Sequence, residues 1–398
     1  MLFLLPFAPR LDTRHGGRAT ASLIAELAAH HDVALLYLRP PEEEGACERV
    51  LGKCAFAEEV KLPETRPIRR RVGLAMSLAR ARPMEAFISS SRSFAETVRR
   101  VTLEWKPQLV QAEFQRMAQY LPPLRDLVPA TVIVAHEADS ASASDALAAA
   151  RGAERIFRAL DLRAWRFYEA AALRSADAIV TFTDRDRSIL AKRVPGLRIV
   201  TIPLRIGIPP RALDPVGDWP PTILFVGGFG HVPNVDAAIR LASSIFPIVR
   251  SRQPEARLEI VGDKPPRSVR VLEGDGIVVT GRVLDVEPYI ARAAVVAAPL
   301  RLGGGMRLKV LEALGAGKPL VATTRAVEGV PVSDGVEALI ADSDFAFAEA
   351  ILRLLDDPEA RRSLGLRARR WAETNLNVAQ SVADYDRLYH ELTGTAAA

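Results

Sequence analysis

The sequence predicts an α/β protein with two domains, each built on a parallel sheet, and three observations support this fold class. Apolar runs of strand length alternate with amphipathic stretches of helix length along most of the chain. The length of 398 residues suits two or three domains. Six prolines gather within residues 203–221, a density that is typical of an interdomain linker. We therefore expect a first domain over residues 1–205, a linker over 206–221, a second domain over 222–375 and a last helix over about 376–398.

The first half alternates predicted strands with glycine loops and helices. The strands are expected at Leu2–Phe7, Val33–Leu38, Leu109–Gln111, Thr131–Ala135, Ala178–Thr183 and Arg198–Pro203. Gly16 and Gly17 lie in the loop after the first strand, and a helix over Thr20–His30 follows that loop. Helical structure is expected over Ala141–Ser175. The side chains expected to be buried on this helix are Trp165, Phe167, Tyr168 and Leu173.

The second half begins a new α/β series. Its strands are expected at Thr222–Val226, Ala256–Val261, Ile277–Thr280, Ala293–Pro299 and Pro319–Thr323. Each of the first three runs directly into glycine, and the fourth is followed by three consecutive glycines, residues 303–305. Because parallel strands end at the same edge of a sheet, these glycines predict a row of backbone donors along that edge. Helices are expected over Val235–Arg250, Asp285–Ala293, Met306–Gly315, Phe345–Asp356, Pro358–Asn375 and Ser381–Leu392.

The stretch from the fourth strand to the next helix has the composition of an anion site. A loop without side chains precedes a helix that carries Arg307 and Lys309 at its start. Cations at that end oppose the helix dipole, so they need another reason to be there, and backbone N–H groups of a glycine loop can approach a phosphate closely. Three glycines can also make a plain tight turn. A P-loop is excluded because Pro319 follows Lys318 where Ser or Thr would bind magnesium, and Gly227 begins no GxGxxG spacing.

Composition excludes several other classes of protein. The net charge of +5 is mild for the length and does not indicate nucleic acid. Two cysteines, Cys47 and Cys54, are too few for a disulfide framework or a metal cluster, so a reducing cytoplasm is expected. The N-terminal run MLFLLPFAPR lacks a basic region and predicts a buried strand, not a signal peptide. No apolar run approaches the ~18 residues of a membrane span.

Positive charge is concentrated in residues 61–110, where apolar side chains are interleaved with arginines. Two interpretations stay open. The stretch is a basic amphipathic surface that contacts anionic lipid at the inner face of the membrane, or it is a solvated arginine-rich helical face. The heavy use of arginine throughout the chain favours the second.

Beyond these general patterns, the second half carries specific motifs. They are FVGGFGHVPNVDAA (225–238), VGDKPP (261–266), VTGRVLDVEPYIARAAVVAAPLRLGGGMRLKVLEALGAGKPLVAT (279–323) and EGV (328–330). Over residues 222–392 this combination resembles the donor domain of family-4 glycosyltransferases, and most of all the bacterial subgroup with the loop GGGxRLKxLEA, common in exopolysaccharide and envelope sugar transferases. The first half matches more loosely through Gly16-Gly17, HHDV (30–33), His136 and FTDRDRSIL (182–190).

The resemblance implies the GT-B fold, in which two Rossmann-like domains with parallel sheets face a central cleft and the last helix crosses back to the first domain. It implies a cytoplasmic, retaining, metal-independent transferase that needs no cofactor and uses a UDP- or GDP-sugar as co-substrate. The acceptor would be a glycan or lipid-linked molecule. The sequence agrees on the metal, since the donor half has no Asp-x-Asp at a predicted sheet-edge turn.

The resemblance also assigns residues. Glu312 would hold the ribose hydroxyls, and Gly281, Arg282 and Val283 would flank the base. His136 would lie near the donor sugar and the acceptor as the catalytic-site residue, with Gly16 and Gly17 in the acceptor-side loop. The residues expected at the diphosphate are Gly227, Gly228, Gly304, Gly305, Met306, Arg307 and Lys309, with Lys309 preferred over Arg307.

The sequence departs from the family pattern at the sugar end. The family spaces two glutamates as Glu-x7-Glu, and eight residues before Glu312 stands Gly304. The usual Arg and Lys after the first strand of the donor domain are also absent, and Arg301, Arg282 or His231 are candidates to compensate. Two alternatives therefore stay open beside the transferase. One is a nucleotide-sugar epimerase of the same fold, which needs carboxylates beside the sugar, and the other is an inactive nucleotide-sugar-binding partner of another transferase.

Overall fold

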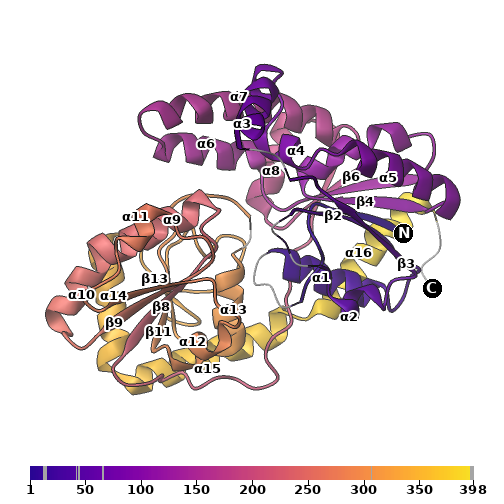
Figure 1. Ribbon diagram of the computed structural model, residues 1–398. Helices are drawn as coiled ribbons and strands as arrows, with labels where there is room; N and C mark the ends of the chain where they lie inside the picture. The colour runs from indigo at the N-terminus through magenta and orange to yellow at the C-terminus, as the bar shows by residue number, and fades with distance from the viewer. Residues whose placement is uncertain (12–15, 42, 44, 65–66, 306, 395–398) are drawn as a thin grey trace. The chain divides into compact units, whose positions relative to one another are not determined.

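The computed structural model describes residues 1–11, 16–41, 43, 45–64, 67–305 and 307–394. The chain divides into two compact units (Figure 1). The first consists of Met1–Leu204 together with Val378–Ala398, and the second of Arg205–Asn377. Each unit is built on its own parallel sheet with helices around it.

The first unit has a seven-stranded parallel sheet in the order β3-β2-β1-β4-β5-β6-β7. Its strands are β1 (Leu2–Leu5), β2 (Ala34–Arg39), β3 (Phe56–Lys61), β4 (Leu109–Glu113), β5 (Ala130–Ala135), β6 (Ala178–Thr181) and β7 (Arg198–Thr201). The central strands β1, β4 and β5 are buried over their whole length, which explains their nearly continuous apolar sequences. Strand β4 also buries two polar side chains, Gln111 and Glu113.

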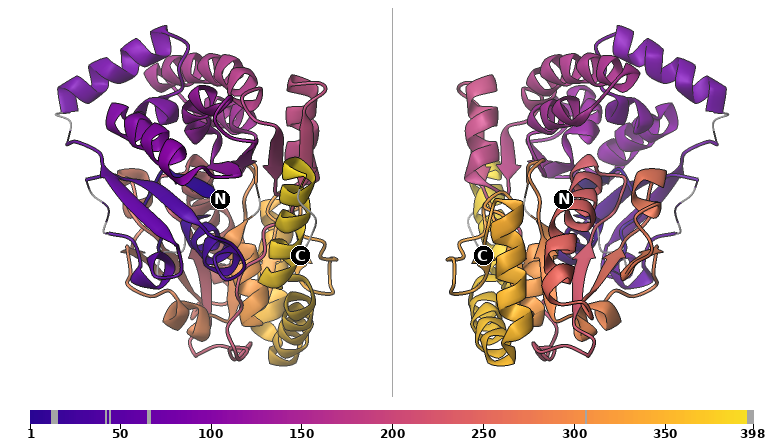
Figure 2. Two further views of the ribbon diagram at one scale, coloured as in Figure 1. Left: turned by 90° about the vertical axis from the view of Figure 1, so that its right-hand side faces the viewer. Right: turned by 90° about the vertical axis from the view of Figure 1, so that its left-hand side faces the viewer.

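Helices connect these strands, and the chain returns to the unit with its last helix, α16. The helices are α1 (Gly16–Leu27), α2 (Glu48–Leu51), α3 (Pro67–Ala79), α4 (Met84–Ile88), α5 (Arg92–Trp105), η1 (Gln115–Tyr120), η2 (Pro122–Leu124), α6 (Asp139–Ala149), α7 (Ala153–Leu173), α8 (Asp184–Arg193) and α16 (Val378–Thr393). Helix α16 packs against α1, and the buried Tyr385 and Tyr389 face into the unit. Helix α3 packs against α7 at the outer edge of the unit (Figure 2).

The second unit has a six-stranded parallel sheet in the order β10-β9-β8-β11-β12-β13. Its strands are β8 (Thr222–Val226), β9 (Arg257–Val261), β10 (Ile277–Gly281), β11 (Val295–Ala298), β12 (Leu320–Ala322) and β13 (Leu339–Ile340). Its helices are α9 (Val232–Arg240), η3 (Leu241–Ile245), α10 (Phe246–Arg252), α11 (Arg267–Arg270), α12 (Glu287–Arg292), α13 (Leu308–Ala316), α14 (Asp344–Asp356) and α15 (Pro358–Asn375). The fold class predicted from the sequence is therefore confirmed.

Some local features differ from the predictions. The helical stretch expected over Ala141–Ser175 is divided into two helices, α6 and α7, because the chain leaves helical geometry after Ala149 and Gly152 adopts a φ of +55°. Phe167 was expected in the core, but it is 59% exposed, because it lies on the face of α7 away from the buried Trp165 and Leu173. The edge strand β3 was missed, since its alternation is masked by Glu58 and Glu59.

The proline-rich segment 206–221 belongs to the second unit and is fixed to it by hydrogen bonds. The Leu213 N–H donates to the Ala316 carbonyl (2.8 Å), and the Asp218 N–H donates to the Arg292 carbonyl (2.9 Å). The Lys318 ammonium is fully buried and donates to the carbonyls of Asp214 and Ala291. Burial lowers the pKa of Lys318 to about 8. Lys318 therefore anchors this segment. This structural role accounts for the lysine after Gly317, which the sequence excludes from a P-loop.

One helical run, Val232–Arg252, is long and apolar enough to cross a membrane by length and composition. Core helices of globular domains pass the same test. The run packs against α14 of the second unit, and its Leu241, Ile245 and Phe246 are buried there. Its apolar character is therefore explained by the core.

Candidate functional site

Glycines at the carboxyl edge of the second sheet pack neighbouring loops tightly together. A Cβ placed on Gly262 would lie 1.8 Å from the Gly227 carbonyl oxygen. The Gly227 N–H donates to the Val261 carbonyl (2.9 Å), and the Gly262 N–H donates to the Gly281 carbonyl (3.2 Å). These two amides extend the sheet, so the expectation of a full row of ligand-facing donors is wrong for them. What these glycines supply is close backbone approach.

The glycine loop after β11 leads into α13 through positive φ angles. Gly303 has a φ of +90° and Gly305 a φ of +68°, values that favour glycine. A Cβ on Gly303 would also lie 2.8 Å from Cγ of Pro233. Helix α13 begins at Leu308 and not at Met306, with Arg307 at the N-cap position. Met306, expected at the diphosphate, lies outside the described residues.

Arg307 is engaged with the glycine loop itself. Its guanidinium donates to the Gly304 carbonyl and, at 3.3 Å, to the Leu302 carbonyl. The side chain therefore holds the loop in shape. Contact between Arg307 and a diphosphate remains a prediction, and the preference for Lys309 gains support from this arrangement.

The Lys309 ammonium joins α13 to the first turn of α9. Its Nζ donates to Oδ1 of Asn234 (2.6 Å) and lies 4.4 Å from the centre of the Phe225 ring. The Asn234 amide in turn donates to the Gly228 carbonyl (2.8 Å). Lys309 and the Gly227-Gly228 loop, which the sequence assigns to the same ligand, thus lie together. Asn234 lies in the first turn of α9 and binds a lysine from another helix, α13.

The environment of Lys309 weakens its hold on its proton. Burial, together with the positive charge of Arg307, lowers its pKa to about 7, although the negative charge of Glu312 acts in the opposite direction. An ammonium that is poorly compensated by the protein is well suited to an anionic ligand. The Lys309 ammonium therefore has an electrostatic character that suits a phosphate ligand.

Glu312 lies one turn after Lys309 on α13 and is partly buried. Its charge acts on Lys309, so the residues predicted for ribose and for diphosphate lie near each other. At the end of β10, Gly281 has a φ of +69°, Arg282 is exposed, and Val283 packs against the cluster around Val286 and Ile290. Their contact with a base stays a prediction.

Two arginines support the loop after β11. Arg301 binds Asp236 with two hydrogen bonds of 2.8 Å. Arg240 is buried, donates to the Pro299 carbonyl (3.1 Å) and pairs with Asp344 (2.6 Å). Arg301, a candidate to compensate for the absent Arg and Lys, is thus held at the α9 end of the loop by a bidentate pair.

In the first unit, His136 follows β5 and is enclosed on three sides. Its Nε2 lies 2.9 Å from Oε2 of Glu113. Its ring stacks on Phe114 at 3.6 Å between ring centres, and Phe182 contacts it edge-on at 4.8 Å. The imidazole is therefore held in one orientation at the carboxyl end of a central strand, where open α/β sheets bind ligands.

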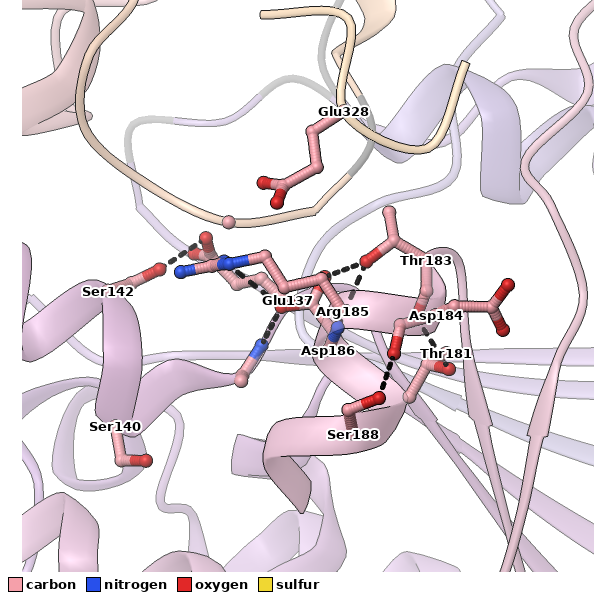
Figure 3. Close-up of polar contacts among 12 residues, drawn as sticks. Glu137, Ser140, Ser142, Thr181, Thr183, Asp184, Arg185, Asp186, Ser188 and Glu328 are labelled. Atoms are coloured by element: carbon pink, nitrogen blue, oxygen red, sulfur yellow. Dashed lines mark hydrogen bonds and ion pairs between the residues drawn. The ribbon is translucent and has the colours of Figure 1, made fainter. Parts of the chain in front are cut away.

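The polar run after His136 is tied to the start of α8 (Figure 3). The Ser142 hydroxyl donates to Glu137 (2.5 Å), and the Ala138 N–H donates to Asp186 (3.2 Å). Asp186 also accepts from the Thr183 hydroxyl (2.7 Å), which caps α8. Burial raises the pKa of Asp139 well above its usual range, and the charges of Glu137, Glu85 and Glu169 raise it further. These contacts fix the backbone on both sides of the His136 strand end.

The predicted acceptor-side loop connects to His136 through aromatic rings. Helix α1 begins at Gly16. A Cβ on Gly17 would lie 3.1 Å from the Phe7 ring. Phe7 contacts Phe114 edge-on at 5.6 Å between ring centres, and Phe114 stacks on His136. The structure thus brings together Gly17 and His136, which are far apart in the sequence.

Glu113, Gln111 and Asn234 were missed by sequence reasoning. A signal existed for the first two, because Gln111 and Glu113 alternate with apolar residues in a strand that is otherwise apolar. Buried polar side chains with this spacing share one face of a strand and need partners. Among the described residues, no group of three His, Cys, Asp or Glu side chains is arranged to hold a metal ion.

The second unit resembles a known protein family in sequence. Residues 220–357 match the family model described as glycosyl transferases group 1. No curated protein sequence matches the chain. The matched range contains the Gly227-Gly228 loop, Lys309 and Glu312. The resemblance drawn from the sequence is therefore confirmed for the donor half.

Solved structures extend the likeness to the whole chain. A sucrose-phosphate synthase from Thermosynechococcus elongatus superposes with a TM-score of 0.72 over 99% of both chains at 17% identity. The fold is GT-B. Anabaena HepE, solved with UDP and glucose, has a TM-score of 0.66 at 11% identity and covers 98% of this chain and 99% of its own. WaaG, a glycosyltransferase involved in lipopolysaccharide biosynthesis, has a TM-score of 0.64 at 16% identity over 99% of this chain and 100% of its own.

The GT-B likeness includes the first unit, whose sequence matches the family only loosely. Its seven-stranded sheet and the return of α16 to that unit are parts of the superposed fold. At these sequence identities the likeness shows the fold alone.

Proposed function

We propose that this protein is a retaining, metal-independent glycosyltransferase that moves a sugar from a nucleotide-diphosphate sugar to a glycan or lipid-linked acceptor. The observation that carries the proposal is the Lys309 ammonium. It lies at the start of α13 against the glycine loop after β8, and burial has lowered its pKa to about 7. This arrangement lies within the range that matches the glycosyl transferases group 1 model.

The donor half would act mainly on the leaving diphosphate. The N-terminus of α13 and the Lys309 ammonium would neutralise the negative charge that develops as the bond between sugar and phosphate breaks. The Glu312 carboxylate would accept hydrogen bonds from the two vicinal ribose hydroxyls, which is favourable for an ionised acceptor. The UDP in the HepE structure supports a UDP-sugar as donor, and a GDP-sugar is the other candidate.

The other half would hold the acceptor. His136 would lie near the donor sugar and the acceptor, and Gly16-Gly17 would form part of the acceptor-side loop. In a front-face retaining transfer the leaving phosphate takes the proton of the acceptor, so His136 is not assigned as a general base. The printed role of WaaG in lipopolysaccharide biosynthesis supports an acceptor in the cell envelope or an exopolysaccharide.

Two alternatives are separated from the transferase by one experiment. The purified protein is incubated with UDP- and GDP-sugars, with and without a lipid-linked glycan acceptor, and the products are identified. We expect release of the nucleoside diphosphate, increased by the acceptor. An epimerised nucleotide sugar without acceptor would replace the proposal by an epimerase. Binding without any donor consumption would indicate an inactive partner protein.

Glu312→Ala is expected to weaken nucleoside diphosphate binding by about 10- to 100-fold, because hydrogen bonds to a charged group contribute roughly 1.5–3 kcal/mol. Isothermal titration calorimetry with UDP and GDP measures this. The matched control is Glu255→Ala, since Glu255 is an exposed carboxylate of the same unit outside the site. Equal affinities of the two variants would remove Glu312 from the ribose site.

We also propose a cytoplasmic protein that contacts the membrane peripherally, through a narrower surface than residues 61–110. On α5, Arg100 pairs with Glu58 and Glu104, and Arg92 pairs with Glu96. Internal pairing of this kind leaves α5 little net attraction for anionic lipid. Helix α3 instead exposes Val72 (54%) and Met76 (50%).

Replacing both Val72 and Met76 by serine is expected to reduce co-sedimentation with vesicles that contain anionic lipid, because inserted apolar area contributes to interfacial binding. The control is Leu284→Ser, which removes a fully exposed leucine from the other unit. If wild type and both variants all stay in the supernatant at low salt, the membrane proposal is wrong.

A further inference from the structure

A line of four hydrogen-bonded side chains runs from the C-terminal helix to His136. The Tyr389 hydroxyl donates to Oε1 of Gln111 (2.6 Å), and the Gln111 amide donates to Oε1 of Glu113 (2.7 Å). Oε2 of Glu113 meets Nε2 of His136 at 2.9 Å. Tyr389 and Gln111 are 278 residues apart in the sequence.

The line is buried almost throughout. Gln111 is 0% exposed and Glu113 1% exposed, and Tyr389 is also buried. A carboxylate inside a protein is strongly unfavourable unless hydrogen bonds compensate it. Gln111 and Glu113 lie two residues apart on β4 and thus on the same face of the strand. Apolar side chains at these two positions would avoid the cost of burying polar groups, so the buried polar pair indicates a task.

The direction of the hydrogen bonds in this line determines which nitrogen of the His136 imidazole carries the hydrogen. The hydroxyl orients the Gln111 amide, whose N–H then faces Glu113. Both carboxylate oxygens accept, so the His136 nitrogen that faces Glu113 carries the hydrogen. His136 is therefore held with hydrogen on Nε2, which leaves Nδ1 for a ligand, and no described residue hydrogen-bonds Nδ1.

Backbone strain at the next residue supports the same conclusion. Phe114 follows Glu113 with a φ of +66° and a ψ of 142°, a region that non-glycine residues rarely adopt. This conformation places the Phe114 ring flat against His136, 3.6 Å between ring centres. Strain of this kind persists only where the surroundings enforce it, and it is concentrated at functional sites. Residues 113 and 114 therefore clamp His136 from two sides.

We propose that Tyr389, Gln111 and Glu113 are positioning residues for His136, so that the C-terminal helix α16 sets the orientation and tautomer of the imidazole. The proposal rests on the proposed function in one respect, namely that His136 acts in sugar transfer. It assigns a task to α16 beyond packing. Loss of one hydroxyl on α16 would disturb His136 through two intervening side chains.

Helix α16 supplies a matched control for the test. Tyr385 lies one turn before Tyr389, both are buried, and their ring centres are 5.8 Å apart. The Tyr385 hydroxyl is buried without a hydrogen-bond partner among the described residues. Tyr389→Phe and Tyr385→Phe therefore remove the same atom from the same helix, and only the first removal breaks the line to His136.

The test combines steady-state kinetics with ¹⁵N NMR of the histidine side chains, in which His136 signals are assigned by their loss in His136→Gln. For Tyr389→Phe we expect kcat to fall about tenfold with an unchanged donor KM. The size is taken from metal-binding histidines, where loss of the residue that hydrogen-bonds the imidazole typically costs about 10- to 100-fold in metal affinity or activity. The fraction of His136 with hydrogen on Nδ1 should rise. Tyr385→Phe should match wild type in both measurements.

Glu113→Gln is the second variant. It removes the charged acceptor while keeping the shape, and we expect kcat to fall about 100-fold and the two tautomers to mix. The NMR measurement needs no enzymatic activity, so it tests the hydrogen-bonded line from Tyr389 to His136 by itself. If no sugar transfer is found, only the proposed function fails. If transfer is found but the tautomer and kcat of Tyr389→Phe equal those of Tyr385→Phe, the positioning proposal is overturned.

Discussion

Lys309→Met is expected to weaken binding of a nucleotide sugar by about 100-fold at neutral pH. The substitution keeps the length and apolar stem of the side chain, but it removes the ammonium that lies against Asn234 and the loop after β8. Charge-assisted hydrogen bonds to phosphate contribute roughly 1.5–3 kcal/mol. Calorimetric titration with a UDP-sugar measures the loss.

The affinity for a nucleotide sugar is expected to fall as the pH rises above neutrality. In the free protein the pKa of Lys309 is lowered to about 7. A bound diphosphate stabilises the ammonium, so its pKa is higher in the complex. Between these two pKa values, binding takes up a proton, and the affinity falls by about tenfold for each pH unit above about 7. A nucleotide sugar is the suitable ligand, because a diphosphate esterified at both ends does not titrate in this range.

Lys309→Arg is the control for the proton effect. Arginine keeps its charge throughout, so the variant should bind with an affinity that is nearly independent of pH above neutrality. Proton uptake is checked by titrations in two buffers that differ in ionisation enthalpy. Wild-type affinity that stays constant from about pH 6 to about pH 9 would show that Lys309 does not contact the diphosphate.

Gly262→Ala is expected to destabilise the second unit by about 3 kcal/mol, at the upper end of overpacking effects. The added Cβ would lie 1.8 Å from the Gly227 carbonyl oxygen, and a backbone atom cannot turn aside as a flexible side chain can. The loop after β8 must shift, and with it the Gly228 carbonyl that positions Asn234 for Lys309. Stability and nucleotide affinity should therefore fall together.

Gly230→Ala is the matched control, because a Cβ on Gly230 meets no atom within 4 Å. Thermal unfolding followed by circular dichroism compares the two variants, and a change of 1 kcal/mol shifts Tm by roughly 2–4 °C for a domain of this size. Equal midpoints for the two alanine variants would show that the loops at Gly227 and Gly262 can separate without loss.

Much of the fold could be predicted because its evidence is local. Apolar runs of strand length and glycines at strand ends indicated five strands of the second unit, and Pro358–Asn375 was predicted with the bounds that α15 has. Weak local evidence explains the failures. Glu58 and Glu59 hid β3, and the run from Ala141 to Ser175 has helical composition on both sides of the break at Gly152. Phe167 was misplaced because periodicity alone did not show which face of α7 is buried.

The sequence by itself determined the fold class and the motif of the donor half, since the glycine loop, Lys309 and Glu312 lie within one contiguous motif of a helix and the loop before it. Only the tertiary structure decided what surrounds those groups. Asn234 reaches Lys309 across 75 residues, and Tyr389 reaches Gln111 across 278. The pKa of Lys309 and the tautomer of His136 depend on burial and on such distant partners. Residue patterns record local periodicity, whereas these contacts exist only after the strands and helices have packed.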